Sequence, residues 1–287
     1  EFYSIIMMEE SIRQFHTQFS FEPVIENGNG LQKTEKFIVC GMGGSALAAG
    51  CLRVRNPRLD LLVHRDYGLP RVPEYFLRGS LIIACSYSGN TEETIDAFEC
   101  ARMAGLRVAA IATGGKLLAL AREQGLPHIA LPATSIQPRM AIGYMTRGLL
   151  KLIGDEAALA ETKMLVETLN PSSFEREGQT LAEALVGTVP VIYDSTVNVP
   201  LAYTWKITFN ETGKTPAFCN VLPELNHNEM TGFDMPESGG PQGEDLVPPR
   251  GESHFEGVRF GLNAPFAFIF LKDPTDDPRI VKRMVVL

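Results

Sequence analysis

The chain of 287 residues has the composition of a globular protein, with 45% hydrophobic and 21% charged residues. That length favours two domains over one. The 34 acidic and 26 basic residues give a net charge of −8 without a basic cluster, which argues against nucleic acid or an anionic membrane as a partner. No apolar run approaches the ~20 residues that a membrane span requires.

The five cysteines are odd in number, widely spaced and mostly set within apolar runs. This usage is typical of a reducing compartment and indicates the cytoplasm. Cys40 and Cys85 each end a strand-like run, and we interpret them as packing residues rather than nucleophiles or metal ligands. Because the sequence contains no CxxC pair and no paired histidine spacing, we expect no metal site.

The predicted elements begin with an N-terminal helix and a polar connector, which together occupy residues 1–36. Short hydrophobic runs then alternate with helical segments. The predicted strands lie at 36–40, 59–67, 80–86, 107–113 and 127–133, and the predicted helices between them lie at 45–55, 91–105 and 116–125. This alternation predicts an α/β fold with a parallel sheet that helices cover on both faces.

A second unit of the same kind is predicted after a helical stretch that runs from residue 141 to Pro171. The sequence predicts a helix and a strand within 181–195, an aromatic-rich helix at 200–213 and a strand at 264–273. Residues 235–257 combine Pro, Gly and charge without periodicity, which predicts a long surface loop. We expect the domain boundary within 150–175 and assign 37–155 to the first domain and 156–287 to the second. No closing element is predicted after residue 273.

The helix that starts near Thr91 has the clearest local signals. Asn90 and Glu93 are spaced as a capping box at its N-terminus. Gly105 is typical of a helix end. The N-terminus of this helix therefore follows directly on a cluster of hydroxyl side chains.

Two strand-to-helix loops, GMGGSA at 41–46 and SYSGNT at 86–91, share one design. In an open parallel sheet such loops lie together at the carboxyl edge. Glycines allow close backbone approach, hydroxyls donate hydrogen bonds, and helix N-termini carry partial positive charge, so the pair suits a phosphate group. The candidate phosphate-binding residues are Gly43, Gly44, Ser45, Ser86, Ser88 and Thr91.

Each loop alone is also explained by a tight turn and a helix cap, and it is their pairing that favours a ligand site. A dinucleotide site fits less well. Ala46 replaces the third glycine of the GxGxxG fingerprint, and the fingerprint leaves the second loop unexplained, although Asp60 or Asp66 stands where an acidic ribose partner is expected. The P-loop pattern GxxxxGK[ST] is absent from the sequence.

The two loops resemble the sugar isomerase (SIS) domain, which binds phosphosugars at these positions. QPRMAIGY at 137–144, FNETGKTP at 209–216 and LPELNHNEMTGF at 222–233 resemble the bifunctional phosphoglucose/phosphomannose isomerase family in order and spacing. The resemblance covers residues 37–234. It implies two doubly wound, flavodoxin-like SIS domains, the second of them incomplete at its C-terminus, because the family continues well past the region that corresponds to DPRIVKRM at 277–284.

The resemblance further implies an isomerase of glycolysis and gluconeogenesis that interconverts glucose 6-phosphate or mannose 6-phosphate with fructose 6-phosphate, without a cofactor. On the same basis Glu211 is the general base, His227 opens the sugar ring, and Arg139 lies beside the active site. The family is typically homodimeric, so we expect a homodimer. The 235–257 loop departs from the family pattern.

The chemistry of aldose–ketose isomerisation requires a base, a cation and a proton donor. A carboxylate can move a proton between C1 and C2 through an enediol, a cation stabilises the oxyanion, and an imidazole can protonate the ring oxygen. From the residues alone, a solvated acid at a helix end is the favoured interpretation of Glu211, and only the resemblance reverses it. On the same basis His227 can be an exposed loop histidine and Arg139 a local pairing group. Two alternatives therefore stay open: a SIS-fold protein that binds a phosphosugar without catalysis, and a nicotinamide-dependent oxidoreductase.

Overall fold

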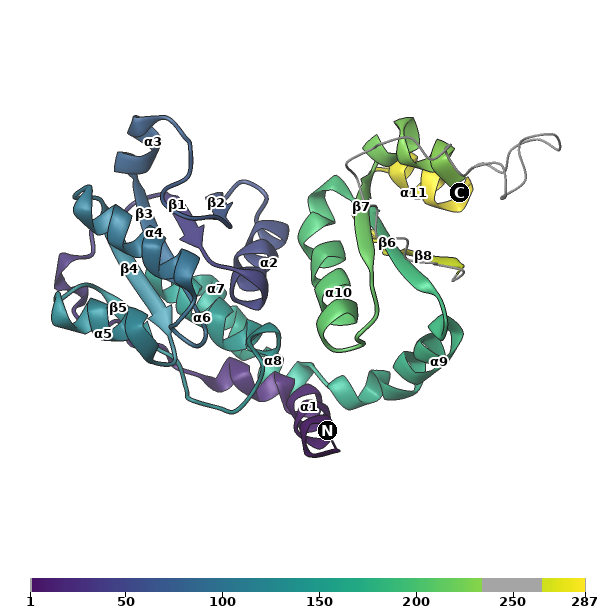
Figure 1. Cartoon of the computed structure of the whole chain (residues 1–287), viewed down its shortest axis with the longest axis horizontal. Coiled ribbons are helices and arrows are strands. Elements are labelled where there is room, and N and C mark those ends of the chain that lie inside the picture. Colours follow the sequence, from purple (N-terminus) through teal and green to yellow (C-terminus); the bar gives the residue numbers. More distant parts are fainter. Residues whose placement is uncertain (1, 234–264, 287) are drawn as a thin grey trace, which may run out of the picture. The chain divides into compact units, whose positions relative to one another are not determined.

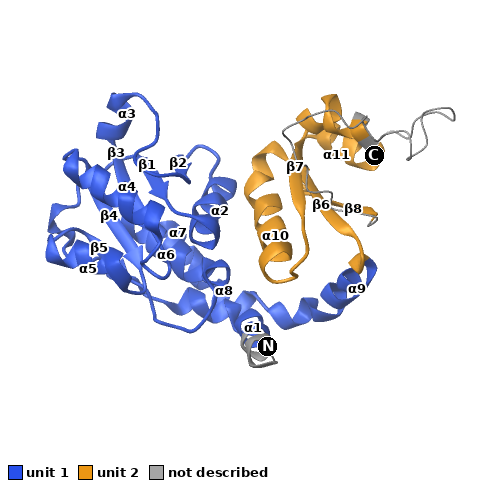
Figure 2. Cartoon of the chain, in the orientation of Figure 1, with its two compact units in different colours: residues 1–184 blue, residues 185–287 orange. Residues whose placement is uncertain are grey.

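The computed structural model describes residues 2–233 and 265–286. The chain divides into two compact units, residues 1–184 and 185–287 (Figure 2). The loop predicted at 235–257 lies outside the described residues. In the part of the chain that is described, no helix has the length and apolar character that crossing a membrane requires.

Unit 1 is built on a five-stranded parallel sheet (Figure 1). Its strands are β1 (Lys36–Cys40), β2 (Asp60–His64), β3 (Ser80–Cys85), β4 (Arg107–Ala112) and β5 (His128–Ala130). Their order in the sheet is β2-β1-β3-β4-β5. This is the flavodoxin-like form of the doubly wound fold, in which the order reverses between β1 and β3. The predicted α/β class and sheet are thereby confirmed.

The central strands β1, β3 and β4 are buried on both faces because they are continuous apolar runs. Successive side chains of a strand point to opposite faces. Ile38 and Ile82 accordingly belong to one core cluster, and Val39 and Ile83 to the other. All four side chains are fully buried, which stabilises the fold by roughly 1.5–3 kcal/mol for each.

Helices cover both faces of this sheet. Helices α4 and α5 contribute to one core cluster, and α2 and α6 to the other. The α-helices of the unit are α1 (Phe2–Arg13), α2 (Leu47–Arg55), α3 (Glu74–Gly79), α4 (Glu92–Met103), α5 (Gly115–Glu123), α6 (Ile142–Ile153), α7 (Glu156–Lys163), α8 (Leu165–Thr168) and α9 (Glu175–Leu185), which ends at the unit boundary. The short 3₁₀ helices are η1 (Phe15–Ser20), η2 (Gly28–Gly30), η3 (Gly43–Ala46), η4 (Pro138–Met140) and η5 (Pro171–Phe174). Helix α3 is an element that the sequence analysis did not predict.

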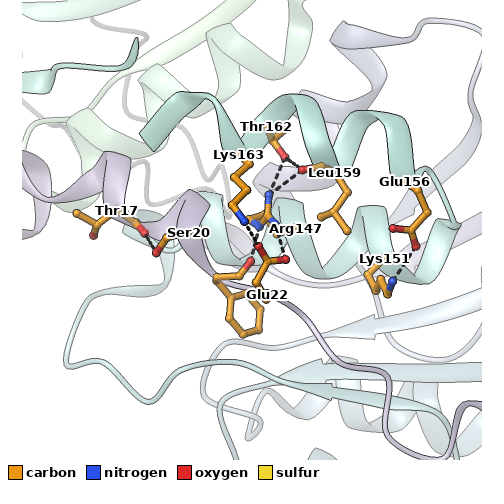
Figure 3. A network of polar contacts seen from close by, with 10 residues as sticks. Thr17, Ser20, Glu22, Arg147, Lys151, Glu156, Leu159, Thr162 and Lys163 are labelled. Carbon is orange, nitrogen blue, oxygen red and sulfur yellow. Dashed lines mark hydrogen bonds and ion pairs between the residues drawn. The ribbon is translucent and has the colours of Figure 1, made fainter. Parts of the chain in front are cut away.

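The N-terminal segment is an integral part of unit 1. The buried Arg147 of α6 donates to the carbonyl oxygens of Phe21 and Leu159 and to the carboxylate of Glu22 (3.2 Å; Figure 3). Glu22 also pairs with Lys163 at 2.7 Å, and this hydrogen bond holds the pKa of the Glu22 carboxyl below its usual range. Side chains of α6 and α7 therefore anchor the segment that the sequence suggested to be a connector.

The capping box predicted at the start of α4 is wrong. Thr91 is the N-cap residue, and its side chain makes no capping hydrogen bond to the helix. Asn90 instead accepts the backbone N–H of Lys116 at the start of α5 (3.0 Å) and so links two loops. The predicted end of the helix is confirmed, because Gly105 follows it with a φ of +64°.

Unit 2 has a parallel sheet whose described strands are β6 (Val189–Ser195), β7 (Phe218–Leu222) and β8 (Phe266–Phe270), in the order β7-β6-β8. Its α-helices are α10 (Val199–Glu211) and α11 (Pro278–Val286), and its 3₁₀ helices are η6 (Thr196–Asn198), η7 (Glu224–His227) and η8 (Glu229–Phe233). Met284 of α11 packs on one face of this sheet, and Ala202 of α10 on the other. Unit 2 is thus also a sheet between helices. Helix α11 corrects the expectation that no closing element follows residue 273, and β7 had not been predicted.

The two units differ in their bounds from the predicted domains. Helices α7 and α8 contact η1 and therefore belong to unit 1, although the sequence analysis began the second domain at residue 156. The sequence gives no sign of that boundary between the units, because helices continue across it without a loop-rich linker. The functional division of the chain at residue 155 stays a prediction.

Candidate functional site

The two predicted phosphate loops lie together in unit 1. Gly41 follows β1 and Ser86 follows β3, which are neighbours in the sheet. The Ser45 hydroxyl accepts the backbone N–H of Tyr87 at 3.0 Å and joins the loops directly. A Cβ on Gly41 would lie 2.8 Å from the carbonyl oxygen of Cys85, so this approach requires glycine. The carboxyl edge of the sheet therefore brings together the loops that the sequence paired.

Ser86 organises the second loop from within. Its side chain is fully buried, and its oxygen accepts the N–H groups of Gly89 (3.0 Å) and Thr91 (3.4 Å). The Thr91 hydroxyl lies 2.8 Å from the same oxygen. Because a hydroxyl has two lone pairs and one proton, the proton of Ser86 is directed to Thr91. Thr91 consequently retains its own proton for a ligand.

The exposed end of this loop carries Ser88, whose hydroxyl accepts the N–H of Asn90 at 3.2 Å and keeps its proton as a donor. Gly89 has a φ of +74°, and a Cβ there would collide with the carbonyl group of Gly114. Gly43 has a φ of +47° at the start of η3. The loops thus fold in conformations that favour glycine, with a hydroxyl donor at the surface.

Two helix N-termini begin at these loops. Helix η3 leads directly into α2, and α4 starts immediately after Thr91. The first N–H groups of a helix have no intrahelical acceptor, and the helix dipole adds partial positive charge there. A phosphate at this edge of the sheet would meet donors from both helices without any lysine.

Arg139 is brought to the same loops by η4. A Cβ on Gly44 would lie 2.6 Å from the Cα of Arg139 and 2.7 Å from the carbonyl carbon of Pro138, so the two backbones are in close contact. Arg139 is half-buried. Of the predicted site residues, those of unit 1 therefore form one constellation around the GMGGSA loop.

Glu211 and His227 belong to unit 2. Glu211 is the half-buried last residue of α10, and the turn that follows is held by a hydrogen bond from the Asn210 side chain to the carbonyl oxygen of Thr215 (3.0 Å). His227 is exposed at the end of η7. Both side chains therefore have access to solvent, as a group that exchanges protons with a substrate requires.

Glu229 is a residue of this region that the sequence analysis did not single out. The hydroxyl of the buried Tyr193 donates to one of its carboxylate oxygens at 2.6 Å, and the Asn220 side chain donates to the other. Burial, together with this carboxylate, raises the pKa of Tyr193. The backbone two residues beyond His227 is thereby tied to β6 and β7. The motif LPELNHNEM contained the residue but gave no sign of its partners.

Asp194 is a second such residue. It lies at the carboxyl end of β6 with 1% of its surface exposed, and it accepts the N–H of Ser195 at 2.7 Å. Burial raises the pKa of its carboxyl to about 7, and the charges of Asp276 and Asp273 act in the same direction. Buried carboxylates at the edge of a sheet are not distinguishable in sequence from surface acids.

Two further observations concern metal and thiol chemistry. Within residues 2–233 and 265–286, no three His, Cys, Asp or Glu side chains are grouped so as to hold a metal ion. Burial raises the pKa of Cys40 to about 12 and also raises that of Cys85. Both side chains are therefore neutral thiols at pH 7, which suits a packing role.

Parallel sheets flanked by helices, with paired glycine and hydroxyl loops at a carboxyl edge, define a doubly wound α/β protein with a candidate phosphate site. The crystal structure of glucosamine-6-phosphate deaminase from Thermotoga maritima shares this fold, with a TM-score of 0.62 at 14% identity over 94% of this chain and 84% of that one. Residues 174–287 match the family described as the bacterial phospho-glucose isomerase C-terminal SIS domain.

Curated relatives identify the family. The bifunctional phosphoglucose/phosphomannose isomerase of Aquifex aeolicus is 34% identical over 231 residues, which cover 79% of this chain and 70% of the relative. The enzyme of the same name from Caldicellulosiruptor bescii is 36% identical over 71% of this chain and 64% of its own length. The chain belongs to the bifunctional phosphoglucose/phosphomannose isomerase family. The resemblance carried by the motifs is thereby confirmed, while the roles of single residues stay predictions.

Proposed function

We propose that the protein is an aldose–ketose isomerase that interconverts glucose 6-phosphate, mannose 6-phosphate or both with fructose 6-phosphate. The observation that carries this proposal is the close packing of the GMGGSA loop, the SYSGNT loop and the Arg139 turn in a chain of this family. A phosphate site next to a cation is what a sugar phosphate with a developing enediolate requires.

Phosphate binding falls to the two loops. Thr91 and Ser88 donate through their hydroxyl protons, and the backbone at Gly43 and Gly44 approaches the phosphate closely. Ser45 and Ser86 contribute to the same site from buried positions, since each holds the backbone of the SYSGNT loop. Hydrogen bonds inside the loop fix the direction of these two hydroxyl donors before the ligand arrives.

Isomerisation then needs one proton moved between C1 and C2. The Glu211 carboxylate removes it and returns it to the neighbouring carbon, while the Arg139 guanidinium stabilises the enediolate oxygen. His227 transfers a proton to the ring oxygen and opens the pyranose before this step. None of the three steps is assigned to a cofactor.

Replacing the base tests the proposal. Glu211→Gln keeps the size of the side chain and removes its basicity, so kcat for fructose 6-phosphate should fall by ~10²–10⁴-fold while the dissociation constant changes by less than about threefold. Glu183→Gln, at an exposed position of α9, is the matched control and should retain full activity. The assay couples formation of each aldose phosphate to a separate detection enzyme.

The outcomes separate the alternatives. Substrate binding without turnover in the wild-type protein would favour a non-catalytic phosphosugar-binding protein. A nicotinamide absorbance change without isomerisation would favour the oxidoreductase. Wild-type activity in Glu211→Gln would contradict the assignment of the base but not the phosphate site.

We propose in addition that the protein works as a cytoplasmic homodimer in glycolysis and gluconeogenesis, with no nucleic acid or membrane partner. The net charge of −8 and the cysteine usage support this setting. Sedimentation equilibrium of the full chain tests the dimer, for which a single species of monomer mass would be the contrary result. The oligomer and the cellular setting do not affect the assignment of the chemistry.

A further inference from the structure

Gln18 lies far in sequence from every motif, yet its side chain contacts the backbone of the Arg139 region. It belongs to η1 and is 3% exposed. Its amide nitrogen donates to the carbonyl oxygen of Met140 at 2.6 Å. Its amide oxygen accepts the N–H groups of Gly143 (3.0 Å) and Tyr144 (3.4 Å). One side chain therefore connects the end of η4 to the first turn of α6.

These contacts replace a local helix cap. The N-cap residue of α6 is Ala141, which has no side-chain acceptor for the first N–H groups of the helix. Gln18 supplies that acceptor from another part of the chain. The start of α6 is consequently positioned by η1 rather than by its own sequence.

The same contacts enclose the Arg139 turn. A Cβ on Gly143 would lie 2.7 Å from the Cβ of Gln18, so this side of the turn packs tightly on the glutamine. On the other side, the backbone of Arg139 lies against Gly44 of the phosphate loop. The turn from 139 to 143 is therefore held between the phosphate loop and Gln18.

We propose that Gln18 is a positioning residue for catalysis, which fixes Arg139 relative to the phosphate loop through the Met140 carbonyl and the start of α6. This inference rests on the proposed isomerase function. It assigns a catalytic contribution to the N-terminal segment, which the sequence placed outside both domains. Loss of the Met140 hydrogen bond lets the turn rotate away, and a guanidinium displaced by ~1 Å stabilises the enediolate poorly.

A second set of contacts makes a matched control possible. Glu22 anchors the same segment to α6 and α7 through Arg147 and Lys163 (Figure 3), and neither of these contacts involves η4. Glu22→Gln weakens this anchor and leaves the Gln18 amide in place. A general loosening of the segment affects both variants, whereas loss of positioning affects only the Gln18 variant.

The test compares Gln18→Met with Glu22→Gln in the full chain. Gln18→Met keeps the shape and removes both hydrogen-bonding arms, so kcat for fructose 6-phosphate should fall about 10–100-fold. The dissociation constant of inorganic phosphate, which reports the loops alone, should change by less than about threefold. Glu22→Gln should lower Tm but leave kcat within about twofold of wild type.

Gln18→Glu is the conservative variant. Its carboxylate still accepts the N–H groups at the start of α6 but cannot donate to Met140. Its kcat relative to wild type should rise as the pH falls, because the protonated carboxyl regains a donor. If Gln18 had only a structural role, kcat would have the same pH profile in Gln18→Glu and in the wild type.

Two results would overturn the inference: a Gln18→Met protein with reduced Tm and wild-type kcat, or an equal loss of kcat in Glu22→Gln. If Gln18→Met does not fold, Gln18→Glu decides through its pH profile. If the wild-type protein shows no isomerase activity, the proposed function fails. The inference is then tested by the binding of a five-carbon sugar-acid phosphate, whose carboxylate takes the place of the enediolate. Gln18→Met should raise the dissociation constant of this compound about tenfold and leave that of inorganic phosphate unchanged, and equal dissociation constants for the variant and the wild type would refute the positioning role.

Discussion

Gly44→Ala tests the geometry of the site through the steric contact of one added methyl group. Gly44 is buried in the GMGGSA loop, and its φ lies outside the left-handed region, so alanine can adopt its backbone conformation. The added Cβ would lie 2.6 Å from the Cα of Arg139 and 2.7 Å from the carbonyl carbon of Pro138. Both neighbours are backbone atoms, so no change of side-chain rotamer can relieve the contact.

The size of the effect follows from these distances. Ordinary contacts of a Cβ begin at 3.4 Å, and the backbone nitrogen of Arg139 lies closer still than its Cα, so the loop and the Arg139 turn must separate by at least 3.4 − 2.6 = 0.8 Å. A misplacement of ~1 Å at a catalytic group costs up to ~10²-fold in rate, which corresponds to about 2.7 kcal/mol in activation free energy. Overpacking of this kind also costs ~1–3 kcal/mol in the free energy of unfolding.

The assay measures kcat and KM for fructose 6-phosphate together with Tm. Gly79→Ala is the control, because its Cβ would meet only the Lys36 side chain at an ordinary distance of 3.6 Å. Gly44→Ala should lose ~10–100-fold in kcat/KM, and Gly79→Ala should lose less than about twofold. A folded Gly44→Ala protein with wild-type kcat/KM would refute the argument that contact with Gly44 sets the position of Arg139.

Two further predictions concern buried polar groups. Ser86→Ala removes the acceptor of Gly89 and the donor to Thr91, so the dissociation constant of inorganic phosphate should rise about tenfold in titration calorimetry, and an unchanged constant would show that Ser86 does not order the loop. Asp194→Asn concerns the pH dependence of stability. Because the folded pKa of about 7 lies above the ordinary 3.8, the native state binds the extra proton, and wild-type stability should fall as pH rises from ~4 to ~7, by up to about 4 kcal/mol. Asp194→Asn should flatten this profile in urea titrations, whereas equal slopes for the two proteins would contradict it.

The central strands of unit 1 were predictable because each is built on a short apolar run. Parallel strands buried on both faces have that composition, and the runs around Ile38 and Ile82 occur at the centre of the sheet as expected. The pairing of the two loops followed from the same rule, since strands that run in parallel end at one edge. These predictions depend only on local composition and on the direction of the chain.

The features that were missed depend on contacts between distant residues. The spacing of Asn90 and Glu93 suggested a capping box, but Asn90 bonds to Lys116, 26 residues further along. Gln18 and Met140 are 122 residues apart. Polar side chains of this kind have several partners available locally, and only the packing of the folded chain selects the distant one.

The hydroxyl cluster at 86–91 shows what composition predicts about a site and what only the structure adds. Three hydroxyls near a helix N-terminus predict a phosphate site, and in composition they are equivalent. In the structure Ser86 accepts two backbone N–H groups, so its single proton must go to Thr91, and Thr91 in turn has no need to donate within the loop. The buried hydroxyl of Ser86 therefore determines that the half-buried Thr91 can donate to a phosphate. Ser86 is for this reason expected to be as necessary for phosphate binding as Thr91.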